Sequence, residues 1–197
     1  MNEKTGNGYT AMSLQIIDWN KFLDDPVESA ITVGVFDGLH RGHTELINLI
    51  VRRGPNPTVI TFRENPKKLL SPEGTYRELF TLNQKLKALE ERGICRVVLI
   101  DFSEEFSKIK GRVFVDLLHE PGKMVYMAIG SDFRCGCQKD TGAGIIKEIN
   151  EGKGIPTDVV PTVFLHDEPV SSSRIRSAIQ HGDMKLAALL MGRDIEQ

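Results

Sequence analysis

"ITVGVFDGLHRGHTELI", residues 31–47, carries the clearest structural signal in the chain. It opens with a β-branched apolar run, 31–36, which predicts a buried strand. From residue 42 to about residue 52, apolar side chains such as Leu46 and Ile50 recur at helical spacing. The glycines and histidines between these segments therefore lie where a strand turns tightly into a helix.

The rest of the chain repeats this alternation of apolar strands and amphipathic helices. Thr81 and Gly93 mark the start and the stop of a helix over 81–92. We expect further strands at 57–62, 96–102, 123–130 and 157–165, helices at 112–120, 142–152, 172–180 and 183–191, and a proline-containing loop after residue 62. Continuous apolar strands that alternate with helices predict an α/β fold, with about five parallel strands flanked by helices.

Ligands of open parallel sheets bind beyond the carboxyl ends of the strands. The connections that matter for function are therefore 36–43, 62–72, 130–141 and 170–176. They also hold the unusual residues of the chain, namely histidines, a C-x-C pair and a serine–arginine run.

Composition narrows the class of protein. The 197 residues include 26% charged and 40% hydrophobic side chains, as is usual for a globular domain. A formal net charge of -2 argues against general electrostatic binding of nucleic acid, and no apolar run is long enough to span a membrane. We expect a disordered lead-in over residues 1–12 and a single domain over 13–197.

The cysteines indicate a cytoplasmic setting. There are three, an odd number, which does not make a disulfide framework, and the N-terminal residues are too polar for a signal peptide. Cys135 and Cys137 have no second cysteine pair nearby, so this C-x-C does not favour a zinc site.

The histidine turn has the physical elements of a phosphate site. Gly38 permits a sharp turn, and Gly42 leaves room at the first helical turn, whose free N–H groups attract anions. His40 and His43 project on the same side if the helix begins near residue 41. Their N–H groups then stabilise negative charge on phosphate. A glycine-rich connection with incidental histidines is the alternative.

The turn does not match two common nucleotide motifs. Residues 34–42 lack the G-x-G-x-x-G dinucleotide fingerprint and the G-x-x-x-x-G-K-[ST] of a P-loop. "GVFDGLHRGH" instead resembles the G-x-F-D-G-x-H-x-G-H motif of bacterial FAD synthetases, the FMN adenylyltransferase module of bifunctional flavin-kinase proteins. The likeness recurs in "VITFRENP" (59–66), "GSDFRCG" (130–136) and "VSSSRIRSAIQHGDMKLAALLMGR" (170–193). This family belongs to the H-x-G-H nucleotidyltransferase superfamily, so the resemblance implies a Rossmann-like fold.

The resemblance also implies a reaction and a set of site residues. ATP and FMN would give FAD and pyrophosphate, with Mg²⁺ arriving on the triphosphate and no metal site built by the protein. Catalytic roles fall on His40, His43 and Arg176. The ATP-binding residues are Gly34, Phe36, Asp37, Gly38, Gly42, Ser172 and Ser173, and the flavin-binding residues are Phe62, Asn65, Pro66, Gly130, Asp132 and Cys135.

Several of these residues have simpler interpretations. Asp37 is equally suited to be a helix cap or a turn residue. In "SSSRIR" (171–176), either Ser172 or Ser173 could cap a helix and leave Arg174 in solvent. The family pattern there is S-S-T-x-I-R, which leaves Arg174 as the variable position.

This chain departs from the family pattern at the expected flavin loops. Glu64 and Asn65 stand where the family has proline and histidine, and Cys135 stands where it has an aromatic residue. Two other functions therefore remain open: a superfamily member with a different phosphorylated acceptor, and a non-catalytic protein that binds nucleotide or flavin.

The sequence that follows Arg193 is short. We therefore expect no riboflavin kinase domain, either in a stand-alone synthetase or in a shortened form of a longer protein. A separate riboflavin kinase would then supply FMN.

Overall fold

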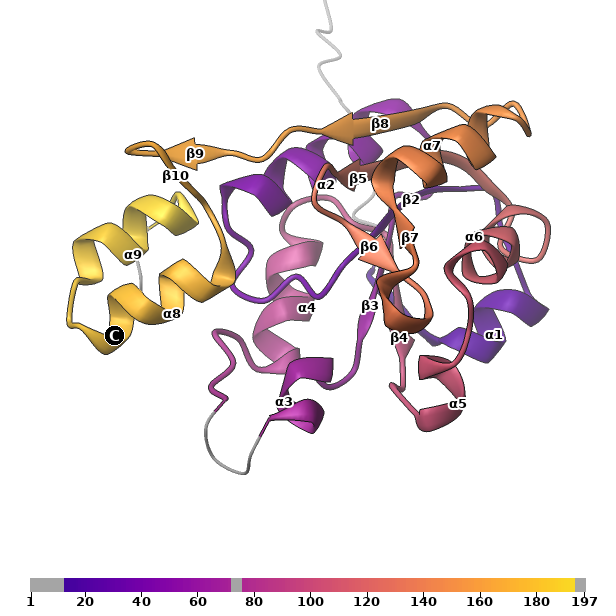
Figure 1. The fold of residues 1–197 in the computed structure, drawn as a ribbon. Coiled ribbons are helices and arrows are strands. Elements are labelled where there is room, and N and C mark those ends of the chain that lie inside the picture. Colours follow the sequence, from indigo (N-terminus) through magenta and orange to yellow (C-terminus); the bar gives the residue numbers. More distant parts are fainter. Residues whose placement is uncertain (1–12, 72–75, 194–197) are drawn as a thin grey trace, which may run out of the picture.

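The computed structural model describes residues 13–71 and 76–193, so the lead-in expected at 1–12 lies outside the described residues. The described part contains a six-stranded parallel sheet in the order β1-β4-β3-β2-β5-β8 (Figure 1). Its strands are β1 (Gln15–Asp18), β2 (Ser29–Val33), β3 (Thr58–Phe62), β4 (Arg96–Ile100), β5 (Met124–Gly130) and β8 (Thr157–Val160).

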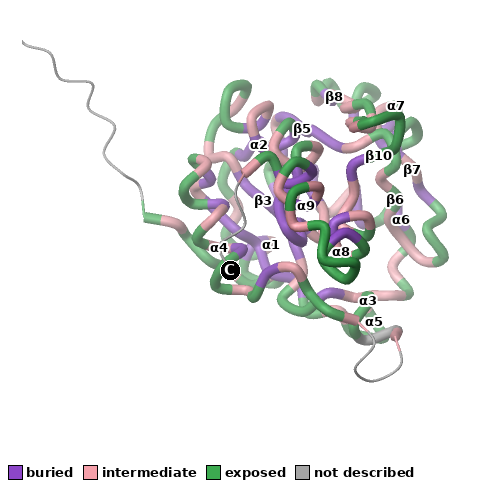
Figure 2. Tube along the Cα trace, turned by 90° about the vertical axis from the view of Figure 1, so that its left-hand side faces the viewer, coloured by how far each residue is buried: buried purple, intermediate pink, exposed green. Residues whose placement is uncertain are grey.

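Helices cover both faces of this sheet because its strand residues alternate between two apolar clusters. Ala30 packs into one cluster and its neighbour Ile31 into the other. The first cluster takes in α2 (Arg41–Arg53), α4 (Leu82–Glu90), α8 (Ser172–Gln180) and α9 (Met184–Met191). The second takes in α1 (Trp19–Asp24), α6 (Gly111–His119) and α7 (Ala143–Glu151). Figure 2 shows the buried segments inside this shell of exposed helices.

Several short elements lie in the connections that follow the strands of the sheet. They are α3 (Pro66–Leu70), α5 (Glu104–Ser107), the antiparallel pair β6 (Arg134–Cys135) and β7 (Thr141–Gly142), the 3₁₀ turn η1 (Cys137–Lys139), and the antiparallel pair β9 (Phe164–Leu165) and β10 (Glu168–Pro169). Within the residues described, no helix combines the length and apolar character needed to cross a membrane.

The α/β fold with a parallel sheet is confirmed, with three corrections. A sixth strand, β1, lies at the sheet edge, where its mostly exposed residues give little hydrophobic signal. The strand expected over 157–165 ends at Val160, and Phe164–Leu165 form a separate hairpin strand. The loop expected after residue 62 contains α3, which Asn65 caps through its side chain.

The sheet places a crevice at the carboxyl end of β2. This strand pairs with β3 on one side and with β5 on the other, so the connections leaving it diverge from those leaving β5. The loops expected to bind ligand therefore meet at one edge.

Candidate functional site

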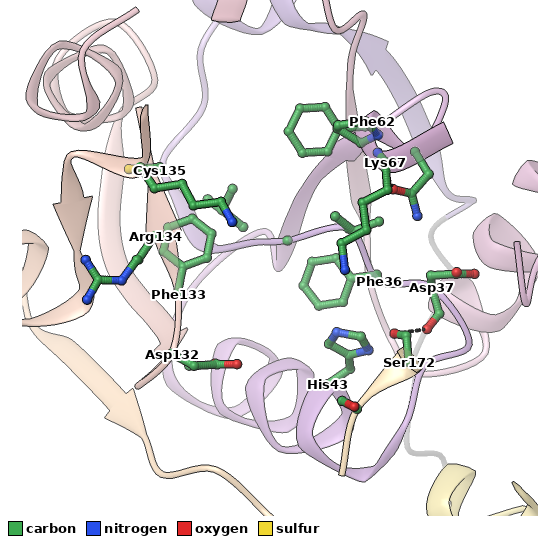
Figure 3. Close-up of a pocket in the computed structure, with 18 of the residues that line it drawn as sticks. Phe36, Asp37, His43, Phe62, Lys67, Asp132, Phe133, Arg134, Cys135 and Ser172 are labelled. Atoms are coloured by element: carbon green, nitrogen blue, oxygen red, sulfur yellow. Dashed lines mark hydrogen bonds between the residues drawn. The ribbon is translucent and has the colours of Figure 1, made fainter. Parts of the chain in front are cut away.

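A cavity of about 1040 Å³ opens at this edge. Segments far apart in the sequence line it: the β2–α2 connection, the end of β3 and the start of α3, Tyr76, the region from the end of β4 to α6, the β5–β7 region, the residues after β8, and the start of α8. Figure 3 shows His43, Asp37 and Ser172 on one side of the space and Asp132, Phe133 and Cys135 across from them. Of the predicted site residues, all except Gly38 line the cavity.

The turn into α2 is built from left-handed backbone. Phe36, Gly38 and Leu39 have φ values of 52°, 82° and 43°. The side chains of Phe36 and Leu39 are fully buried, and their packing stabilises a backbone conformation that is costly for residues other than glycine. A Cβ on Gly38 would lie 2.7 Å from the Cδ1 of Leu79, so this glycine shapes the turn from behind rather than facing the cavity.

The two histidines lie against each other at the start of α2. The helix begins at Arg41 with His40 as its N-cap, and the His40 and His43 rings stack at 3.7 Å between centroids. Burial lowers the pKa of His40 to about 4, against the opposing charge of Asp132. The pKa of His43 is held well below its usual range by burial first, and then by His40 and Lys85. Both imidazoles are therefore neutral at neutral pH, and each keeps one N–H donor.

The Nδ1 atoms of both histidines are buried and have no hydrogen-bond partner among the described residues. Buried polar atoms are normally paired in folded proteins, so these two unpaired nitrogens mark the histidine pair as unusual, and both histidines line the cavity. The N-terminus of the 13-residue helix α2 adds free backbone N–H groups at the same place. This part of the cavity suits an anion.

Asp37 does not cap α2, which corrects one of its two simpler interpretations. Its side chain is only 5% exposed, and its carboxylate accepts hydrogen bonds from the backbone N–H groups of Leu79 and Phe80, at 2.8 and 3.1 Å. Arg176 donates to it through Nη1 at 2.8 Å, and the hydroxyl of Tyr76 donates at 3.3 Å. The carboxylate thus ties three segments of the chain together.

The start of α8 is fastened to the same turn. Ser172 donates its hydroxyl to the backbone carbonyl of Asp37 at 2.8 Å. The cap of α8 is Ser171, whose side chain accepts from the N–H of Arg174, so the caps expected at Ser172 or Ser173 are wrong. Arg174 is not free in solvent either, since it forms an ion pair with Glu168 at 2.8 Å.

The opposite side of the cavity is apolar and aromatic. Phe62 lies edge-on to Phe102 at 5.8 Å, and both line the space together with Phe106 and Phe133. Cys135 is half-buried on β6, where burial raises the pKa of its thiol to about 11 and keeps it protonated. Flat apolar ligands fit a wall of this kind.

Asn65, a predicted flavin residue, is engaged by the protein itself. It is 2% exposed, its side-chain oxygen accepts from the N–H of Lys67, and its amide donates to the Tyr76 hydroxyl at 2.6 Å. Its neighbour Pro66 begins α3 and lines the cavity.

Sequence reasoning missed several residues of the site, among them the aromatic residues Phe102, Phe106 and Phe133 and two polar residues, Tyr76 and Lys85. Tyr76 stacks under Arg176, with the guanidinium carbon 4.7 Å from the ring centroid. Lys85 lies buried beneath the histidine turn, and its ammonium donates to the carbonyl of Phe62 at 3.2 Å. Lys85 could have been found as a charged residue on the apolar face of a predicted helix. Tyr76 comes after a stretch of sequence without periodicity, so the sequence contains no comparable signal for it.

Comparison with known proteins identifies the family of this chain. A family model described as FAD synthetase matches residues 23–174. Curated relatives called bifunctional riboflavin kinase/FMN adenylyltransferase include those of Pseudomonas fluorescens, 29% identical over 82% of this chain and 53% of the relative, and Bacillus subtilis, 29% identical over 86% and 55%. The chain spans about half the length of these relatives.

Solved structures extend the likeness. A crystal structure titled macrolide-efflux protein, from Streptococcus pneumoniae, is 27% identical with a TM-score of 0.79 and covers 91% of this chain and 62% of that chain. A pantoate-beta-alanine ligase from Francisella tularensis shares the fold, at 17% identity and a TM-score of 0.56, over 87% of this chain and 77% of that one. The family model covers well over half of the residues and includes the histidine turn and the start of α8. The chain therefore belongs to the FAD synthetase family.

Proposed function

We propose that this chain transfers the adenylyl group of ATP to FMN, giving FAD and pyrophosphate. The observation that carries the proposal is a single cavity with an anion-binding side and a flat apolar side. An FMN phosphate oxygen attacks the α-phosphorus of ATP, and the bond to the pyrophosphate oxygen breaks as the new one forms. Positioning and charge stabilisation suffice for this step, so no covalent intermediate is needed.

The anion-binding side supplies the groups that this chemistry needs. His40 and His43 direct neutral N–H donors at phosphate oxygens whose charge grows in the transition state. Arg176 receives the leaving pyrophosphate, with the hydroxyl of Ser173 beside it. Ser172 donates its one hydroxyl proton to the Asp37 carbonyl and so holds the start of α8 against the turn. Gly34 and Gly42 line the cavity without side chains, which leaves room for the nucleotide to approach the backbone.

The apolar side fits the isoalloxazine ring of FMN. Phe62 and Phe133 offer aromatic surface, Pro66 and Cys135 add apolar contact, and Gly130 and Asp132 border the space towards the nucleotide. Lys67 lines the cavity, and its side chain extends into the space (Figure 3). Its positive charge suits a phosphorylated acceptor.

Mg²⁺ is expected to accompany the triphosphate and to neutralise part of its charge. Magnesium bound to a triphosphate keeps several waters and needs no dedicated cage of protein ligands.

We further propose that the described residues form one adenylyltransferase domain and that a separate riboflavin kinase supplies FMN. One six-stranded sheet, with the ligand loops gathered at one of its edges, supports a single domain within the described residues. The cysteines at 95, 135 and 137 are free thiols, which fits the cytoplasm.

An assay for pyrophosphate and FAD tests the proposal. ATP and CTP are each offered with FMN, with riboflavin and with other phosphorylated acceptors. We expect FAD from ATP plus FMN and no FMN from riboflavin. Turnover with another phosphorylated acceptor but not with FMN would show that FMN is not the acceptor. Binding of ATP and FMN without release of pyrophosphate would favour a non-catalytic role. The departures at Glu64, Asn65 and Cys135 make the acceptor the part of the proposal most worth testing.

A further inference from the structure

Tyr76 connects the two sides of the cavity. Its hydroxyl accepts a hydrogen bond from the side-chain amide of Asn65 at 2.6 Å and donates to the Asp37 carboxylate at 3.3 Å. Its ring lies under the guanidinium of Arg176, 4.7 Å from the guanidinium carbon. One side chain therefore contacts the loop after β3, the turn after β2 and helix α8.

Asn65 supports Tyr76, and both ends of its side-chain amide are engaged by the protein. Its side-chain oxygen accepts from the N–H of Lys67 at 3.0 Å, while its amide nitrogen faces the tyrosine hydroxyl. Burial, the main cause, raises the pKa of Tyr76 to about 12, so the hydroxyl stays protonated and remains a donor to Asp37.

Arg176 is held at two points, by Asp37 and by Tyr76. Asp37 binds Nη1 in an ion pair whose side chains are 13% and 5% exposed, which fixes one corner of the guanidinium. The ion pair alone leaves the plane of the guanidinium free to rotate about that contact. Stacking on the Tyr76 ring removes this freedom and presents the flat group to the cavity.

We propose that Tyr76 is a positioning residue: it fixes the plane of the Arg176 guanidinium for the triphosphate, and Asn65 fixes Tyr76. This inference rests on the proposed function for its ligand, because it assigns Arg176 to the phosphates of ATP. It also gives Asn65 a role that differs from direct flavin contact.

Binding of a non-hydrolysable ATP analogue, measured by calorimetry, tests the inference without an acceptor. We expect Tyr76→Leu to weaken binding about three- to thirty-fold, the range of a partly buried cation–aromatic contact. Tyr76→Phe keeps the ring but loses the hydrogen bonds with Asn65 and Asp37, so its affinity should lie between those of the wild type and Tyr76→Leu. Tyr126→Phe is the matched control: it also loses a tyrosine hydroxyl bonded to an aspartate, at 2.7 Å, but does not line the cavity.

Arg176→Lys separates positioning from general stability. Lysine keeps the charge for Asp37 but has no flat group to stack. If Tyr76 acts through Arg176, Tyr76→Leu should have almost no further effect on analogue binding in the Arg176→Lys background. Losses that multiply in the double variant, or a Tyr76→Leu protein that binds like the wild type, would overturn the inference.

The KM values for the two substrates provide a further readout. With FMN as acceptor, Tyr76→Leu should raise KM for ATP while leaving KM for FMN near its wild-type value, and an equal rise in both would contradict a role confined to Arg176. Should Tyr76→Leu fail to fold, Tyr76→Met, which is also apolar and lacks a ring, takes its place. A wild-type protein that binds the analogue but forms no FAD would refute the proposed function and leave this inference testable.

Discussion

The two walls of the cavity are built in different ways. The phosphate wall comprises residues 36–43, 76–80 and 171–176, and buried directional hydrogen bonds centred on Asp37 hold it together. The acceptor wall comprises Phe62, Phe133 and Cys135, and it is held mainly by apolar packing against the second cluster. Both walls face the same space (Figure 3).

This difference indicates which wall tolerates changes of side chain and which does not. Charged hydrogen bonds lose most of their strength when distance or angle changes, so the phosphate wall tolerates little change. Apolar contacts accept other side chains of similar size at a modest cost. We infer that the phosphate wall sets the type of reaction and the acceptor wall sets the acceptor.

The largest effect is expected from breaking the centre of the phosphate wall. Asp37→Ala leaves Arg176 as a buried cation without its partner, which should lower the free energy of unfolding by about 3–5 kcal/mol. Asp101→Ala is the control, because this carboxylate is 71% exposed in its pair with Arg63 and should cost about 0–1 kcal/mol. Equal losses in urea unfolding of the two variants would remove the distinction between the walls.

The next effect concerns turnover rather than stability. His43→Ala removes one preorganised donor and should slow the adenylyl transfer about a hundred- to a thousand-fold, while the fold stays intact. Steady-state kinetics and circular dichroism of the purified variant check this. A folded variant that keeps more than about a tenth of the wild-type kcat would place His43 outside the mechanism.

The buried histidines also predict how stability depends on pH. The pKa values of His40 and His43 are lowered in the folded protein, so only the unfolded chain takes up these protons as pH falls below about 6.5. Stability should therefore decline as pH falls from about 6.5 to about 4, the folded-state pKa of His40, by up to about 1.4 kcal/mol per pH unit for each histidine. The double variant His40→Gln, His43→Gln should show a flatter decline in urea unfolding, and an unchanged slope would contradict this account.

The smallest effect tests the acceptor wall. Cys135→Phe restores the aromatic residue of the family pattern and should tighten FMN by about two- to ten-fold while leaving ATP binding unchanged. Separate titrations of both ligands, with melting curves, measure this, and Cys137→Phe is a control just outside the cavity lining. Unchanged or weaker FMN binding in an equally stable protein would count against flavin contact at this position.

Sequence periodicity was sufficient for most of the fold. The helix at Leu82–Glu90 has the predicted cap at Thr81, completed by Gln84 as a capping box, because such caps depend on neighbours along the chain. The edge strand β1 was missed because its side chains are mostly exposed. The break at Pro161 was missed because apolar residues continue on both sides of it.

The site was predicted less completely, for a different physical reason. Glycines and histidines within one turn give a local signal, so the histidine turn was found and its residues do meet in one cavity. The ties from Asp37 to Ser172 and Arg176 join positions more than 130 residues apart, and no spacing along the chain encodes them. The roles assigned to the lining residues remain predictions.

The long separation between Asp37 and α8 has a consequence for protein synthesis. A ribosome releases the histidine turn and the central strands well before residues 171–176 emerge from its exit tunnel. Until then the Asp37 carboxylate lacks the guanidinium that neutralises it, and the phosphate wall is missing one of its three segments. Nascent chains should therefore acquire nucleotide binding in one late step, when α8 docks through buried Ile175.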